Sequence, residues 1–120
     1  MTYLEKAQDI YAQIGQGKLL EAFDQYYSDN VVMTEPMGTR EGKVACREYE
    51  IQFLNSIAEV HGLEVKNIAS DEENATTFIE NVLDVSFKDG NRAKMEQVSV
   101  QKWEGDQIVH ERFYYDRGVN

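Results

Sequence analysis

One carboxylate in this sequence has a backbone setting that the other acids lack. Glu35 directly precedes Pro36, the single proline of the chain. A proline ring restricts the residue before it to extended backbone geometry, which helps to fix where the Glu35 side chain points. In an apolar interior, desolvation raises the pKa of a carboxyl toward the range useful for proton transfer. The alternative is a solvated loop acid, as most of the 22 Asp and Glu residues must be.

Other kinds of chemistry have little support in the composition. Two histidines, His61 and His110, and one cysteine, Cys46, cannot supply a structural zinc site, so we expect no metal. No glycine-rich phosphate loop and no nucleophile elbow occurs. The formal net charge of −10 disfavours nucleic acid and anionic membranes as partners. The lone cysteine suits a reducing compartment, and the sequence shows neither a signal peptide nor a membrane span, so we expect a cytoplasmic protein.

The elements that must position Glu35 follow from hydrophobic periodicity. A period of 3.6 residues in the first half predicts three helices, at 2–15, 19–27 and 43–60, the last closed by His61 and Gly62. Between the second and third helices, 31–35 reads as a short strand that Pro36 ends, and 39–42 reads as a polar loop.

The second half of the chain changes to a period of two, which is typical of strands. Four strands are expected, at 63–69, 75–88, 93–104 and 107–116, with a hairpin at Asp89-Gly90. Helices segregated before an antiparallel meander predict an α+β fold, with three N-terminal helices packed on a curved antiparallel sheet. The 120 residues suffice for a single domain over 1–120.

This order of elements resembles the nuclear transport factor 2-like cone fold, whose small bacterial members include the SnoaL-like polyketide cyclases and the ketosteroid isomerases. The segment 27–38, with its acid before Pro-Met-Gly, is similar to the isomerase stretch that carries the general base, and Glu35 stands at that position. The segment 108–116 looks like the closing strand of SnoaL-like proteins. Ser99 stands where the isomerases have a second, protonated acid, which is a departure from their pattern.

The resemblance also implies a role for Tyr11, which fills the position of the oxyanion-hole tyrosine on the first helix. A phenol hydroxyl there would donate a hydrogen bond to a bound carbonyl or phenolate. The alternative is a core tyrosine on an amphipathic helix, with its hydroxyl at the rim of the core. Glu35 and Tyr11 together indicate proton abstraction beside the carbonyl of a small apolar compound, with no cofactor required.

Alternate residues of the sheet are expected to line the pocket, with Glu80, Val82 and Asp84 on the same face as Ser99. The expected binding residues are Met33, Met37, Tyr49, Phe53, Val82, Met95, Gln97, Ser99, Phe113 and Tyr115. The opposite face would carry Ile79, Leu83, Val85, Phe87, Val98 and Val100. Because that face is apolar too, we expect it to form an isologous homodimer interface.

Two classes of function therefore stay open at this stage. The first is an enzyme of the isomerase or cyclase type that acts on a small apolar carbonyl compound. The second is a non-catalytic dimeric module that holds a ligand or a packed core, which the missing second acid at Ser99 favours.

Overall fold

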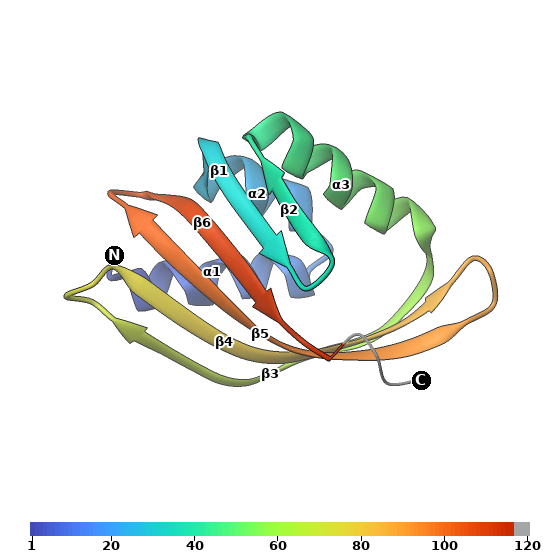
Figure 1. Cartoon of the computed structure of the whole chain (residues 1–120). Coiled ribbons are helices and arrows are strands. Elements are labelled where there is room, and N and C mark those ends of the chain that lie inside the picture. The colour runs from blue at the N-terminus through green and yellow to red at the C-terminus, as the bar shows by residue number, and fades with distance from the viewer. Residues whose placement is uncertain (117–120) are drawn as a thin grey trace.

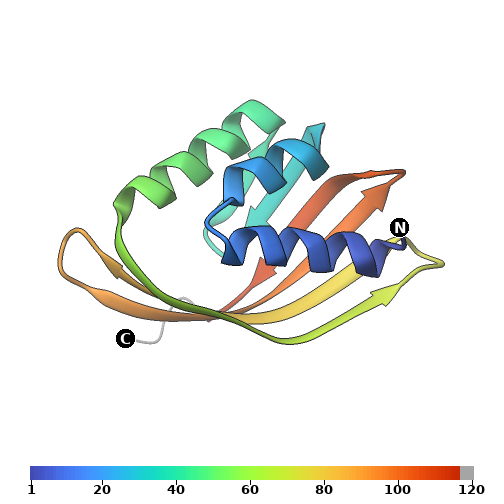
Figure 2. The same ribbon diagram turned by 180° about the vertical axis from the view of Figure 1, so that it is seen from behind.

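The computed structural model describes residues 1–116 as three helices on one side of a curved six-stranded sheet (Figures 1 and 2). The helices are α1 (Tyr3–Gly15), α2 (Leu19–Tyr26) and α3 (Lys43–Ser56). The strands are β1 (Tyr27–Glu35), β2 (Gly38–Glu41), β3 (Ile57–Asp71), β4 (Thr76–Phe87), β5 (Arg92–Glu104) and β6 (Gln107–Tyr114). Their order in the sheet is β2-β1-β6-β5-β4-β3, with β1 and β6 parallel and the other neighbours antiparallel. The predicted α+β fold is confirmed.

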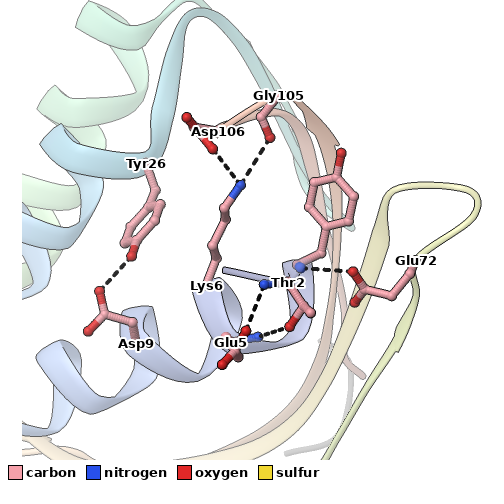
Figure 3. A network of polar contacts seen from close by, with 9 residues as sticks. Thr2, Glu5, Lys6, Asp9, Tyr26, Glu72, Gly105 and Asp106 are labelled. Carbon is pink, nitrogen blue, oxygen red and sulfur yellow. Dashed lines mark hydrogen bonds and ion pairs between the residues drawn. The ribbon is translucent and has the colours of Figure 1, made fainter.

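Helix α1 begins with a capping box. The Thr2 hydroxyl accepts a hydrogen bond from the Glu5 amide at 3.1 Å, and the Glu5 carboxylate accepts one from the Thr2 amide at 2.8 Å. Figure 3 shows that two sheet turns join this helix end. Glu72, between β3 and β4, accepts from the first two backbone amides of the helix, and Lys6 pairs with Asp106, between β5 and β6, at 2.7 Å. These contacts fix α1, and hence Tyr11, against the sheet.

Helix α3 is shorter than its sequence pattern predicts. It ends at Ser56 instead of Val60, and the Ser56 hydroxyl donates to the Phe53 carbonyl at 2.6 Å. The chain then runs directly into β3, which pairs with β4 from Ile57 to Asp71. His61 and Gly62, expected to close the helix, lie inside this strand. The prediction was wrong because long-range pairing with β4 outweighs the helical periodicity of the last turn.

The region around Pro36 is also more extended than expected. Strand β1 begins at Tyr27 rather than Val31, and the expected loop at 39–42 contains β2. Glu35 pairs with Gly38, so Pro36 and Met37 form a two-residue turn between the strands. The proline does end β1, and the chain returns beside it.

The register of β4 differs from the prediction by one residue. The Phe87 amide donates to the Asn91 carbonyl at 2.7 Å, so odd-numbered residues of β4 face odd-numbered residues of β5. Residues Ile79, Asn81, Leu83 and Val85 therefore lie on the helix-covered face with Ser99, Gln97, Met95 and Ala93. Residues Glu80, Val82 and Asp84 lie on the opposite face, contrary to expectation. The assignments for β5 and β6 are correct, since Ser99 pairs with Phe113 and Gln101 pairs with Glu111.

The hydrophobic core occupies one end of the space between the helices and the sheet. Its buried members come from α1, α2, β1, α3, β5 and β6: Ile10, Ala22, Phe23, Tyr26, Tyr27, Val31, Met33, Cys46, Trp103 and Ile108. Most of β3 is exposed. Helix α3 packs mainly against β1, α2 against β6, and α1 against β3 and β4, and cavities lie beside the core. None of the helices that residues 1–116 form is long and apolar enough to cross a membrane.

Candidate functional site

Two adjoining cavities lie between the helices and the inner face of the sheet. The tyrosine cavity, of about 110 Å³, is lined by Ile10, Tyr11, Ile14, Leu19, Phe23, Tyr27, Glu50, Phe53, Leu63, Asn81, Leu83, Gln97, Glu111 and Phe113. The Glu35 cavity, of about 130 Å³, is lined by Glu35, Tyr49, Glu50, Phe53, Leu83, Met95, Gln97, Phe113 and Tyr115. Glu50 and Phe53 of α3 belong to both walls. The cavities therefore meet beneath this helix.

Glu35 lies at the end of β1 and is held by two partners. One carboxylate oxygen accepts from the Arg40 guanidinium at 2.5 Å, and the other accepts from the Tyr115 hydroxyl at 3.2 Å. The side chains of Glu35 and Arg40 are 14% and 20% exposed, so water screens this ion pair only in part. The Arg40 guanidinium also lies 3.5 Å from the centre of the Tyr49 ring. Burial, then the charge of Glu35, raises the pKa of Tyr115 to about 12.

Tyr11 faces the tyrosine cavity from α1. Its hydroxyl accepts a long hydrogen bond of 3.4 Å from the Asn81 amide group. Burial, reinforced by the charge of Glu111, raises the pKa of Tyr11 far above that of an ordinary phenol. The phenol therefore keeps its proton at any physiological pH. It can donate a hydrogen bond to a bound oxygen.

Glu50 is the acid that our sequence analysis overlooked. Burial raises its pKa to about 7, and the nearby charges of Glu111 and Glu35 add to this effect, while Arg40 opposes it. Within residues 1–116, no side chain donates a hydrogen bond to its carboxyl group. The sequence does hold a signal, because Glu50 follows the buried Cys46 by four residues and precedes Phe53 by three, which places it on the covered face of the helix.

Glu111 is a third acid, and it is almost completely buried at 1% exposure. One oxygen accepts from the Tyr27 hydroxyl, and the other accepts from Ser99 at 2.5 Å and from Gln101 at 2.9 Å. Burial raises the pKa of Glu111, and these three hydrogen bonds oppose the rise. The Ser99 hydroxyl therefore donates its hydrogen bond to Glu111. It takes part in a buried network instead of replacing the second acid of the ketosteroid isomerases.

Six of the ten expected binding residues line the cavities, but four lie elsewhere. Ser99 is fully buried and donates a hydrogen bond to Glu111. Met33 is packed in the hydrophobic core, at 1% exposure. Met37 lies at the tip of the β1–β2 turn and is 73% exposed. Val82 lines a groove on the outer face of the sheet, because of the one-residue difference in register. Asn81 and Leu83 occupy the inner positions that we had assigned to Glu80, Val82 and Asp84.

A third and larger cavity, of about 460 Å³, adjoins the tyrosine cavity at Ile14, Leu19, Phe53, Leu63 and Leu83. Its lining consists of apolar side chains and three glycines. It can accept an apolar part of a ligand whose polar part lies beside Tyr11 and Glu50. Among residues 1–116, no group of three or more His, Cys, Asp and Glu side chains is arranged to hold a metal ion.

Comparison with known families bears on how this site is classified. A family model described as "SnoaL-like domain" matches residues 1–115, nearly the whole chain. The chain belongs to the SnoaL-like family. This confirms the resemblance that the segments around Glu35 and residues 108–116 had indicated.

Solved structures share the fold of this chain. A candidate SnoaL-like polyketide cyclase from Mesorhizobium loti is 29% identical, with a TM-score of 0.83 over 96% of this chain and 100% of that one. A candidate isomerase from Bacillus subtilis is 19% identical, with a TM-score of 0.81 over 97% and 90% of the two chains. A protein from Catenulispora acidiphila with a ketosteroid isomerase-like fold, solved with trimethylamine, is 15% identical, with a TM-score of 0.74 over 91% and 84%. A comparison with curated proteins found no match.

Proposed function

We propose that this SnoaL-like protein binds a small apolar carbonyl compound between its helices and its sheet, and transfers a proton at the carbon beside the carbonyl without a cofactor. One observation carries this proposal. The Glu35 carboxylate and the Tyr11 phenol, a proton acceptor and a permanently protonated donor, line two cavities that share Glu50 and Phe53 as a wall.

In the proposed step, the Glu35 carboxylate removes a proton from the carbon, and electron density moves to the carbonyl oxygen. The Tyr11 hydroxyl donates a hydrogen bond to that oxygen as its negative charge develops. The large apolar cavity beside Leu63 and Leu83 takes up the rest of the compound. Tyr115 and Arg40 hold the Glu35 carboxylate in position from both of its oxygens.

The test is deuterium incorporation from heavy water into a panel of enolisable ketones, followed by proton NMR. We expect Glu35→Gln to slow the exchange by about 10² to 10⁴-fold, because the base is lost. Tyr11→Phe should slow it by about 10²-fold, because one donor to the oxygen is lost. Glu41→Gln, an exposed acid on β2, is the matched control. Unchanged turnover in Glu35→Gln would remove Glu35 from the mechanism.

A non-catalytic binding module is the second candidate. The observation that favours it is the 2.5 Å ion pair between Glu35 and Arg40, which already occupies one oxygen of the carboxylate. A thermal-shift screen with phenols, steroids and fatty acids separates the two. Stabilisation by an apolar ligand, together with no deuterium exchange into any ketone, would favour the binding module.

We further propose that two copies pair through the outer face of the sheet, and that the protein works in the cytoplasm. The three helices within residues 1–116 lie on the other face of the sheet (Figures 1 and 2). Phe78 and Tyr114 are 40% and 50% exposed on the outer side, and Val98 and Val100 lie between them. The free Cys46 is buried, which is compatible with a reducing compartment.

A further inference from the structure

A serine, a histidine and a glutamate form a chain of polar contacts on the outer face of the sheet. The Ser86 hydroxyl on β4 lies 2.7 Å from Nε2 of His61 on β3. Nδ1 of the same ring lies 3.6 Å from the carboxylate of Glu59, also on β3. The three helices lie on the other face of the sheet (Figures 1 and 2). This cluster is therefore separate from the cavities that hold Glu35 and Tyr11.

The pairing of β3 with β4 brings the three side chains together. Glu59 and Ser86 are direct partners across the two strands. Val60 pairs with Val85 and Gly62 pairs with Asp84, so His61 is an extra residue of β3 and forms a bulge. A bulge changes the direction in which a strand residue points. Here it leaves the His61 ring on the outer face, between the Glu59 carboxylate and the Ser86 hydroxyl.

The order of these contacts assigns a role to each nitrogen of the His61 ring. The Glu59 carboxylate favours a proton on Nδ1, because a hydrogen there faces a negative charge. In neutral imidazole Nε2 then carries no proton and accepts the hydrogen bond of the Ser86 hydroxyl. A serine hydroxyl bonded to an imidazole, with a carboxylate behind the other ring nitrogen, is the arrangement that activates serine as a nucleophile on unrelated folds.

A cation borders the Ser86 hydroxyl on the side of β5. Arg92 is the direct strand partner of Ser86, and its guanidinium donates two hydrogen bonds of 3.0 Å to Asp84. Directly paired residues have their Cβ atoms about 5 Å apart. The N–H groups of Arg92 that Asp84 does not use are therefore donors available to an oxygen atom that becomes negative beside Ser86.

The cluster is open to compounds from solution. The side chains of His61 and Glu59 are 22% and 69% exposed. The face proposed for pairing of two copies is centred on Phe78, and Ser86 lies eight residues further along β4, roughly 25 Å away. Pairing through Phe78 would thus leave the Ser86 hydroxyl accessible.

We propose that Ser86 is a nucleophile, activated by His61 and Glu59, that takes up the acyl group of an activated carboxylic ester such as an aryl ester or a thioester. The inference goes beyond the proposed function, because none of these three residues lines the cavities of that site.

The proposed step balances in atoms and electrons. Oγ of Ser86 forms a bond to the carbonyl carbon of the ester, and the hydroxyl proton passes to Nε2 of His61. The bond from that carbon to the leaving oxygen or sulfur then breaks and takes its electron pair to the leaving atom. His61 returns the proton to this atom, which departs as a phenol or a thiol. Ser86 is left as an O-acyl ester, and Glu59 stabilises the imidazolium that exists in between.

The test uses para-nitrophenyl acetate. Release of nitrophenolate measures the rate, and peptide mass spectrometry finds the acetylated residue. We expect the unaltered protein to acquire one acetyl group, on Ser86, and Ser86→Ala to lose it. Ser70→Ala is the matched control, because Ser70 is a serine of β3 that has the Glu72 carboxylate as its partner instead of an imidazole. This variant should be acetylated like the unaltered protein.

Variants of the other two residues test the activation of Ser86. His61→Ala should slow its acetylation by about 10² to 10⁴-fold, because the general base is lost, and added imidazole should restore part of the rate. Glu59→Gln should slow it less, because Glu59 only orients the ring and stabilises its charge. Acetyl groups on lysines or on His61 with none on Ser86 would overturn the proposal. So would an equal rate at Ser86 in His61→Ala, or a slow rate that imidazole does not raise.

Discussion

Glu35 and Glu50 line the same cavity, but an arginine forms an ion pair with only one of them. Arg40 lies 2.5 Å from the Glu35 carboxylate, whereas burial and two negative neighbours raise the pKa of Glu50 to about 7. This contrast arises from the fold, because the β1–β2 turn brings Arg40 beside Glu35 while Glu50 comes from α3 on the opposite wall. Glu50 is therefore the acid with a raised pKa in this cavity, and Glu35 is the one with a cationic partner.

Replacing Glu50 should make stability depend less on pH. An unfolded glutamate has a pKa near 4.5, whereas the pKa of folded Glu50 is about 7, so the unaltered protein loses stability as pH rises between these values. Glu50→Gln removes this loss. Urea unfolding at pH 4 and at pH 8 measures the free energy of unfolding of both proteins. Between pH 4 and pH 8, the stability of the variant relative to the unaltered protein should increase by about 1 to 3 kcal/mol. A constant difference at both pH values would contradict the raised pKa.

Removing the cation of the cavity should affect both acids. Arg40→Met leaves Glu35 partly buried without its partner, and we expect a loss of about 2 kcal/mol of stability at pH 7. Because Arg40 also lowers the pKa of Glu50, that pKa should rise above 7 in the variant. Arg47→Met is the matched control, since Arg47 pairs with Asp24 at the exposed surface and should cost less than about 1 kcal/mol. An equal loss of stability in the two variants would show that burial of the Glu35 pair has no effect.

The buried Glu111 network should matter for folding. Glu111→Leu leaves the hydroxyls of Tyr27 and Ser99 and the amide of Gln101 without their acceptor, so we expect a loss of about 3 kcal/mol. Glu104→Gln, at the exposed end of β5, should change stability by less than about 0.5 kcal/mol. Chemical denaturation followed by Trp103 fluorescence measures both. Equal stability of the two variants would mean that the network contributes nothing.

The outer face of the sheet should mediate association. Sedimentation at micromolar concentration should find a species of twice the 13.8 kDa chain mass. Phe78→Lys combined with Val100→Lys places two charges on this face and should give a monomer. Glu48→Lys, at an exposed position of α3 on the other side of the sheet, is the control for added positive charge. If the unaltered protein sediments only as a monomer, the homodimer proposal is wrong.

The period-two pattern predicted Phe113 on the inner face of β6, where the structure has it. The family resemblance implied that Glu35 and Tyr11 act at one site, and the structure has them in two neighbouring cavities, so their roles stay predictions. Val82 was assigned to the wrong face because the register of the β4–β5 hairpin was off by one residue. The register decides which alternate residues of β4 point toward the helices, and the Asp89-Gly90 turn signal alone does not fix it.

Glu50 was overlooked for a different reason. Helical spacing could place it on the stripe of Cys46 and Phe53, but whether that stripe is covered by apolar groups or by other acids depends on how α3 crosses the sheet. The negative neighbours that raise its pKa, Glu35 and Glu111, are 15 and 61 residues away in the chain. Such a meeting of distant acids requires the folded structure.

The most direct test of the account is a carbon-13 NMR titration of the glutamate carboxyl groups in the unaltered protein and in Glu50→Gln. The account predicts one glutamate that titrates at about pH 7 and is absent from the spectrum of the variant. If that resonance persists in Glu50→Gln, or if Glu50 titrates near 4.5 like an exposed glutamate, the raised pKa of Glu50 in this cavity is contradicted.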